Sequence, residues 1–233
     1  MGRLLAGEIA SFFQSPQPYD ESISTEHYRQ QAAADLEIVV PPGQTQRREA
    51  TWDGLLNALS CGKYRGVVLI GAYGYHNDEL GEQVSYRDHP IYQRLTNPTL
   101  ARFLDEFTKH RRNEELAVAR ELIPRINPPA GGKFWLLTLV TKQDLWWTDR
   151  SEVKAFYTGG EYAAEVGKLL ARLRTARARV EVVLASLVVS NFVTGRGELL
   201  KNTAAGYDQT EHATALNGLV AALDGLRRWE DEQ

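Results

Sequence analysis

Four polar residues follow an apolar run near the middle of the chain. The run 133–140 reads KFWLLTLV, and Thr141, Lys142, Gln143 and Asp144 come directly after it. A carboxylate held at the end of a strand accepts two parallel hydrogen bonds well, and a lysine two residues earlier can lay its alkyl stem along a flat ring. The spacing therefore favours a site for a planar group that carries two adjacent N–H donors.

Guanine has such a pair of donors on one edge, namely its ring N–H and its amino group. The residues Thr141-Lys142-Gln143-Asp144 resemble the [N/T]-K-x-D guanine-recognition motif of Ras-like GTPases. The resemblance implies that Asp144 reads the base of GTP or GDP and that Lys142 packs against it, with Thr141 opening the motif. The alternative interpretation is a polar loop after a strand, because a pattern of four residues is short.

A second segment, residues 36–48, also resembles Ras-like GTPases. The segment 36–48, LEIVVPPGQTQRR, is similar to the part of Ras- and Arf-like proteins in which a strand ends in D-x-x-G followed by glutamine. Gly43 then matches the glycine whose amide meets the γ-phosphate, and Gln44 matches the catalytic glutamine that orients the attacking water. Val40 stands where the family has an aspartate that supports Mg²⁺, which counts against a magnesium cofactor. The alternative is a Pro-Pro-Gly turn followed by a chance glutamine.

Two further residues take roles from the resemblance alone. Ser186, in the run VVLASLVV, lies where the family places its serine–alanine loop, which contacts the base. Thr25, in SISTEHYRQ, matches the switch threonine that touches Mg²⁺ and the γ-phosphate. Ser22 and Ser24 compete with Thr25 for that role, and an ordinary strand start is the alternative for this segment.

The phosphate loop of this family is missing from residues 1–233. The motif G-x-x-x-x-G-K-[ST] holds the phosphates with backbone N–H groups, and the Gly-Lys pairs that begin at Gly62, Gly132 and Gly167 are not followed by serine or threonine. The chain opens with MGRLLAGEIASFF, which resembles the helix after that loop. We therefore expect one of two cases. Either a phosphate loop is encoded upstream of Met1, or the domain is a pseudo-GTPase that binds a protein partner or a second copy of itself.

The order of apolar runs predicts the fold class. Continuous apolar runs at 66–74, 133–140 and 180–189 alternate with helical patterns, which is typical of an α/β protein with a mainly parallel sheet and helices on both faces. The resemblance implies a Ras-like fold without its first strand, as a single domain over 1–233 with an insertion at roughly 75–125. Ligands in such sheets bind beyond the carboxyl ends of the strands.

Turn and cap signals predict the remaining elements. The segments 25–31 and 35–40 are expected to be two strands joined by a short turn. Helices are expected to begin at Thr51 and at Asn97 with Pro98 in the first turn, and further helices are expected over the ranges 2–14 and 160–176. The last helix is expected to begin at a capping box formed by Asp208 and Glu211.

Composition excludes several classes of protein. The 233 residues carry a formal net charge of −3, which gives no reason to expect nucleic acid as a partner. A single cysteine, Cys61, excludes a disulfide framework and suits a cytoplasmic location. The sequence contains no apolar stretch long enough to span a membrane, and its first residues do not fit a signal peptide.

Overall fold

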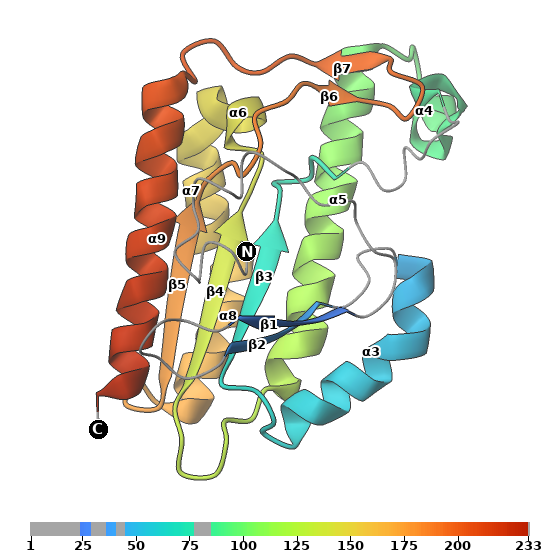
Figure 1. Cartoon of the computed structure of the whole chain (residues 1–233). Coiled ribbons are helices and arrows are strands. Elements are labelled where there is room, and N and C mark those ends of the chain that lie inside the picture. Colours follow the sequence, from blue (N-terminus) through green and yellow to red (C-terminus); the bar gives the residue numbers. More distant parts are fainter. Residues whose placement is uncertain (1–23, 29–35, 41–44, 77–84, 233) are drawn as a thin grey trace.

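Three parallel strands form the central sheet. The computed structural model describes residues 24–28, 36–40, 45–76 and 85–232. Within them, β3 (Gly66–Gly71), β4 (Phe134–Val140) and β5 (Ala178–Leu184) are hydrogen-bonded in the order β3-β4-β5, with β4 in the middle (Figure 1). Each predicted apolar run contains one of these strands, which confirms an α/β protein with a parallel sheet, although β3 is not covered on both faces, since Ile70 is 58% exposed.

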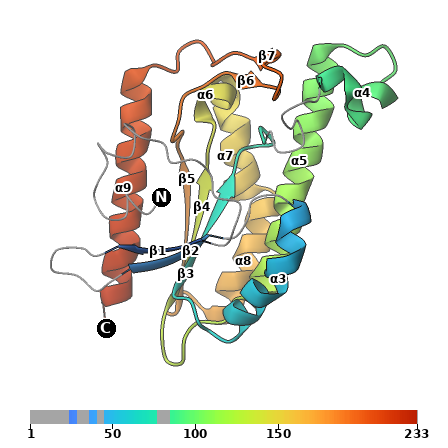
Figure 2. The ribbon, with the colours of Figure 1, turned by 45° about the vertical axis from the view of Figure 1, so that its right-hand side comes forward.

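Helices cover both faces of this sheet. Figure 2 shows α9 (Gln209–Asp231) on one face, and α5 (Leu100–Leu122), α7 (Arg150–Gly159) and α8 (Glu161–Leu173) on the other. Side chains alternate between the faces of a strand, and accordingly Leu137 and Leu139 of β4 pack against α9, while Leu136 and Val140 belong to the cluster on the opposite face. Burial on both faces explains why β4 is apolar at every position except Thr138.

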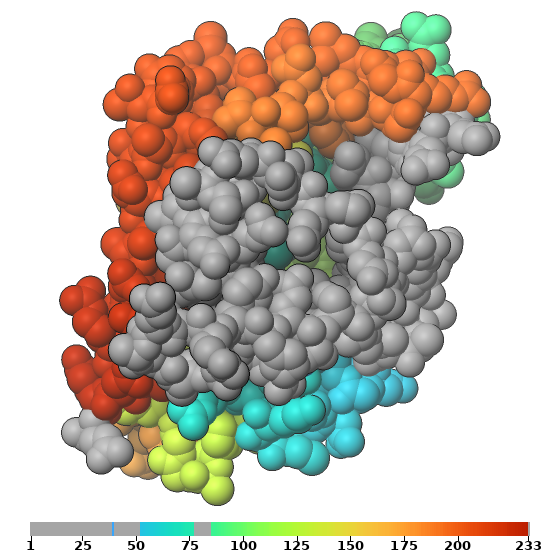
Figure 3. All heavy atoms as spheres, viewed as in Figure 1, coloured from blue at the N-terminus to red at the C-terminus, as the bar shows by residue number. Residues whose placement is uncertain are grey.

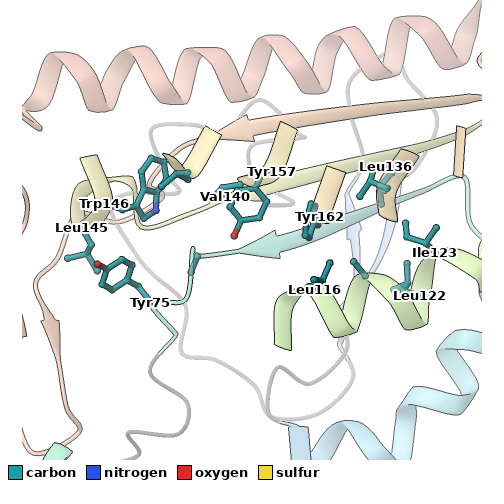
Figure 4. Close-up of a cluster of buried hydrophobic side chains, with 14 of the residues drawn as sticks. Tyr75, Leu116, Leu122, Ile123, Leu136, Val140, Leu145, Trp146, Tyr157 and Tyr162 are labelled. Atoms are coloured by element: carbon teal, nitrogen blue, oxygen red, sulfur yellow. The ribbon is translucent and has the colours of Figure 1, made fainter. Parts of the chain in front are cut away.

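The larger hydrophobic cluster lies between the sheet and helices α5, α7 and α8. Figure 4 shows the aromatic rings of Tyr157 and Tyr162 among aliphatic side chains from α5 and β4. The two rings meet edge to face, with their centroids 4.9 Å apart. The hydroxyl of Tyr162 lies 3.1 Å from Oγ1 of Thr138, so these two buried hydroxyl groups are partners in a hydrogen bond.

Two helix starts differ from the predictions, and one agrees. Helix α3 (Thr45–Ser60) begins before Thr51, which therefore lies inside it. Helix α5 begins after Thr99, whose Oγ1 accepts a hydrogen bond from the Arg102 N–H at 3.3 Å, so Asn97 is not the cap. The cap of α9 is confirmed, because Asp208 accepts hydrogen bonds from the N–H groups of Thr210 and Glu211.

An antiparallel pair of strands precedes α3. Strand β1 (Ser24–Tyr28) pairs with β2 (Leu36–Val40), which confirms the two strands predicted there. In the part of the chain that the structure describes, this pair shares no ladder with the central sheet. The helix expected over 2–14 lies outside the described residues.

Short elements cover the carboxyl ends of the central strands. Helix α6 (Gln143–Trp146) and the 3₁₀ turn η4 (Trp147–Asp149) follow β4, and the pair β6 (Phe192–Val193) and β7 (Leu199–Lys201) lies between β5 and α9. In Figure 3 this last segment, drawn in orange, forms the upper surface of the molecule. The remaining short helical elements are η2 (Tyr86–Asp88), α4 (Pro90–Arg94) and η3 (Ile123–Arg125).

One predicted strand boundary and one predicted irregular region need correction. Strand β5 ends at Leu184, although the apolar run continues to position 189. The side chains of Val188 and Val189 are instead 56% and 42% exposed, because the chain turns away from the sheet after Ser186. The described part of the region 75–96 contains η2 and α4, which the polar composition of that region did not indicate.

None of the described helices combines the length and apolar character that crossing a membrane requires.

Candidate functional site

The turn after β4 is fixed by a left-handed residue and by hydrogen bonds from Thr141 and Trp146. Lys142 adopts a left-handed conformation with φ 60° and ψ 31°, which ends the strand and starts α6. The N–H and Oγ1 of Thr141 both donate to the carbonyl oxygen of Gly71, at 2.7 and 2.9 Å, and so tie the turn to the end of β3. The indole N–H of the buried Trp146 donates to the Thr141 carbonyl at 2.7 Å. The motif is therefore a fixed turn rather than a loose loop.

The structure brings Asp144 and Ser186 together. Ser186 Oγ donates to Asp144 Oδ1 at 2.5 Å, and the Asp144 N–H lies 3.2 Å from the same Oγ. Ser186 follows β5 by two residues, and Asp144 follows β4 by four. Because β4 and β5 are neighbouring parallel strands, their carboxyl ends place both residues at one edge of the sheet.

The second carboxylate oxygen of Asp144 also has a protein donor. The backbone N–H of Ser190 lies 3.0 Å from Oδ2. The Asp144 side chain is fully buried, with an exposed fraction of 0%. The resemblance implies a carboxylate that projects from the rim of the sheet into a cleft for a purine, and the complete burial of Asp144 contradicts that implication. The physical reason is that the chain beyond β5 closes over the turn and satisfies both oxygens.

Lys142 lies two residues before Asp144 in this turn. Its side chain is half-buried. A lysine stem of this kind is free to lie along a flat ring, which is the role that the resemblance assigns to it.

Polar and aromatic neighbours that were not predicted surround Ser186. The His212 Nε2–H donates to the Ser186 carbonyl at 3.0 Å. The Tyr207 hydroxyl lies 3.4 Å from Oε1 of Gln143, and its ring meets that of Trp147 edge to face at 5.4 Å. Burial, with a smaller contribution from the Asp144 carboxylate, raises the pKa of Tyr207 above its usual value. Tyr207 therefore stays neutral and able to donate.

The structure does not define how three of the predicted site residues lie relative to Asp144. Gly43 and Gln44 lie outside the described residues, so their relation to Asp144 is not defined. Thr25 lies in β1, opposite Val39, and only its position in the ladder is described. These residues stay predictions for the phosphate end of a nucleotide site.

The residues that the structure describes do not form a site for Mg²⁺. Mg²⁺ requires oxygen ligands in octahedral geometry, whereas the aspartate position of the family is taken by Val40, which pairs with Ser24 in the β1–β2 ladder. Among the described residues, no group of three or more His, Cys, Asp or Glu side chains is arranged to hold a metal ion. No chemical step through magnesium is derived for this chain.

A second buried carboxylate, not predicted from sequence, lies at the end of β3. Oε1 of Glu115 accepts from the N–H groups of Ala72 and Gly74, at 3.1 and 2.9 Å, and lies 2.7 Å from His76 Nε2. Oε2 accepts from the Tyr157 hydroxyl. Burial alone raises the pKa of Glu115, but the hydrogen bonds and the charge of His76 outweigh it and hold that pKa below the usual value. This carboxylate fixes the backbone that leaves β3.

A surface hollow of about 390 Å³ lies beside this end of the sheet, between α5 and α7. Tyr73, Tyr75, Arg112, Asp149 and Lys201 are among the residues that line it. None of the predicted site residues takes part, so the hollow is separate from the Asp144–Ser186 pair.

Comparison of the chain with models of protein families, with curated proteins and with solved structures gives no match. Function is therefore inferred from the geometry of the Asp144 turn.

Proposed function

We propose that this chain is a guanine-nucleotide-binding domain of the Ras-like type, in which Asp144 reads the base. The observation that carries the proposal is the pairing of Asp144 with Ser186. The resemblance assigned contact with the base to both residues, and 42 positions separate them in the sequence. They lie together beyond the carboxyl ends of parallel strands, where sheets of this class bind ligands.

The chemistry of the turn supports guanine over other planar groups. A carboxylate accepts two parallel hydrogen bonds, and guanine offers a ring N–H and an amino group side by side. The left-handed Lys142 stands two residues before Asp144 in a turn fixed by Thr141 and Trp146. A fixed turn loses less conformational entropy on binding a flat ring than a loose loop does.

Hydrolysis of GTP is an extension of this proposal. It assigns to Gln44 the orientation of the attacking water and to Gly43 the contact with the γ-phosphate. The extension requires a phosphate loop, which the sequence 1–233 does not contain. Without that loop we expect weak binding of nucleotide, because the phosphates then contribute little.

The second candidate function is that of a pseudo-GTPase, a non-catalytic module that binds a protein partner or a second copy of the chain. The observation that favours it is the complete burial of Asp144. Large apolar side chains are also exposed on the segment that covers the carboxyl edge, at Val188, Val189 and Leu199. Such side chains suit a protein interface.

Calorimetric titration with GDP and with GTP, with and without Mg²⁺, separates the two candidates. The proposal predicts a heat of binding for the wild type that is lost in Asp144→Ala and kept in Asp149→Ala, a change of an aspartate five residues away. Circular dichroism checks that each variant is folded. If none of the three proteins binds GDP or GTP, nucleotide recognition at this site is refuted.

The module is tested by self-association. Sedimentation velocity over a range of protein concentrations is compared for the wild type and for the double variant Val188→Ser, Val189→Ser. A module that binds its own copy through this segment associates as the wild type and loses the association in the variant. Identical behaviour of the two proteins excludes this segment as a self-association surface.

A further inference from the structure

The Ser190 backbone N–H donates to a carboxylate oxygen that the proposed recognition of guanine needs. It is 3.0 Å from Oδ2 of Asp144, while Ser186 Oγ donates to Oδ1. The two adjacent donors of guanine require both carboxylate oxygens. Each oxygen has two acceptor positions, so Ser186 can keep its bond, but the Ser190 segment covers the approach to the fully buried carboxylate.

We propose that residues 188–190 are an internal cap on the base site, which guanine displaces when it binds. The proposal rests on the proposed function, because it describes how the same site is controlled. The Ser190 N–H acts as a stand-in for one guanine donor and prevents the buried carboxylate from being left with an unpaired oxygen. Leaving such a group unpaired is costly in a buried environment.

The cap is weakly held by apolar packing. Val188 and Val189, two of its three residues, have exposed fractions of 56% and 42%, whereas Leu187 before them packs against the buried cluster under α9. Moving them away from the turn removes little apolar surface from contact with the protein, so the main loss is the hydrogen bond between Ser190 and Asp144. A hydrogen bond from the guanine edge to Asp144 compensates for the lost bond from Ser190.

Fixed residues stand on both sides of the cap. Ala185 is fully buried, and the Ser186 carbonyl is bound by His212 Nε2 at 3.0 Å. On the other side, the buried Phe192 begins β6, and the Asn191 side chain accepts from the Thr203 N–H at 3.0 Å. The displacement is therefore confined to the few residues between Ser186 and Asn191, and Ser186 stays beside Asp144.

The exchange adds to the discrimination between bases. Guanine has two neighbouring donors and can replace the Ser190 N–H on Oδ2. Adenine presents one amino donor beside a ring nitrogen that accepts, so it cannot satisfy both oxygens. We expect adenine nucleotides to leave the Ser190 bond in place.

The test is a titration of the ¹⁵N-labelled full chain with GDP and, separately, with ADP, observed at the Ser190 amide by NMR. We expect GDP to shift this amide and to increase its hydrogen exchange as binding saturates, and ADP to do neither. Ser190→Pro, which removes the N–H, is expected to bind GDP about tenfold more tightly than the wild type, as the loss of one competing hydrogen bond implies. Val188→Ala, which keeps the N–H, is the matched control and is expected to bind as the wild type does.

Each outcome decides the proposal. A Ser190 response to GDP, or binding of GDP by Ser190→Pro alone, supports the cap. Binding of GDP that depends on Asp144 but leaves the Ser190 amide protected overturns the cap and leaves the proposed function standing. An absence of GDP binding in both the wild type and Ser190→Pro overturns both. Because the amide is followed in the wild type, a folding defect of the proline variant does not decide the result.

Discussion

Ser186 and Asp144 are joined by two hydrogen bonds that run in opposite directions. The Ser186 hydroxyl donates to the Asp144 carboxylate, and the Asp144 backbone N–H donates to the Ser186 hydroxyl oxygen. A third bond, from Ser190 N–H, completes the set. The end of β4 is thereby linked to the segment that follows β5, and the link passes through one buried carboxylate.

This buried carboxylate is expected to contribute to stability. Asp144→Ala leaves the Ser190 N–H without its acceptor in a buried place, and we expect a loss of about 2–4 kcal/mol in the free energy of unfolding. Urea denaturation followed by tryptophan fluorescence measures the loss. Asp149→Ala is the control, because Asp149 is half-exposed and its distance to Lys201 Nζ is 4.0 Å; its effect is expected to stay below about 1 kcal/mol. Equal losses in the two variants contradict the expected role of Asp144.

The Glu115 cluster is expected to make stability depend on pH. The folded state lowers the pKa of this carboxyl below its ordinary value of 4.5, so its stabilisation is present above that pH and is lost as the pH falls through the lower, folded value. Glu115→Gln removes this dependence and is expected to cost about 1.5–3 kcal/mol at neutral pH, as for other hydrogen bonds to a charged group.

Denaturation between neutral and acid pH tests the Glu115 prediction. The wild type is expected to lose stability more steeply than Glu115→Gln as the solution becomes acid. Glu121→Gln, at an exposed position on the same helix, is expected to keep the slope of the wild type. Parallel curves for all three proteins would show that Glu115 has the same pKa in the folded and unfolded states.

The turn after β3 requires glycine at position 74. Gly74 has φ +84°, and a Cβ at this position would lie 2.2 Å from the backbone oxygen of Thr108. Gly74→Ala is therefore expected to lower the free energy of unfolding by more than about 3 kcal/mol. Gly167→Ala is the matched change inside α8, where nothing lies within 4 Å, and it is expected to stabilise by about 0.5–1 kcal/mol. Thermal unfolding compares the two, and a mild effect of Gly74→Ala would contradict the close approach to α5.

The buried strands were the part of the fold most readable from sequence. The run before Thr141 is apolar except at Thr138 because β4 is covered on both faces, as is typical of a strand in the middle of a parallel sheet. The cap of α9 was also readable, since Asp208 supplies a side-chain acceptor at the required place. The start of α5 was not, because Asn97 and Thr99 are both good caps, and Asn97 instead adopts φ 55° outside the helix.

The sequence predicted only part of the environment of Asp144. The proximity of Ser186 follows from two neighbouring parallel strands. The bond from Ser190 does not, because a backbone N–H is present at every residue except proline and leaves no signature in the sequence. Glu115 was missed for a related reason. Several glutamates lie along α5, and only tertiary packing decides that this one faces the end of β3.

Recognition of guanine by Asp144 is tested most sharply by a change of base preference. Xanthine carries an oxygen acceptor in place of the guanine amino donor, and an amide at position 144 offers the matching N–H. NMR titration of the wild type and of Asp144→Asn with GDP and with XDP gives four association constants. We expect the wild type to prefer GDP and Asp144→Asn to shift the ratio toward XDP by about tenfold or more, the value of one matched hydrogen bond to a charged group. An unchanged ratio, or no binding of either nucleotide by either protein, would show that Asp144 does not read the base.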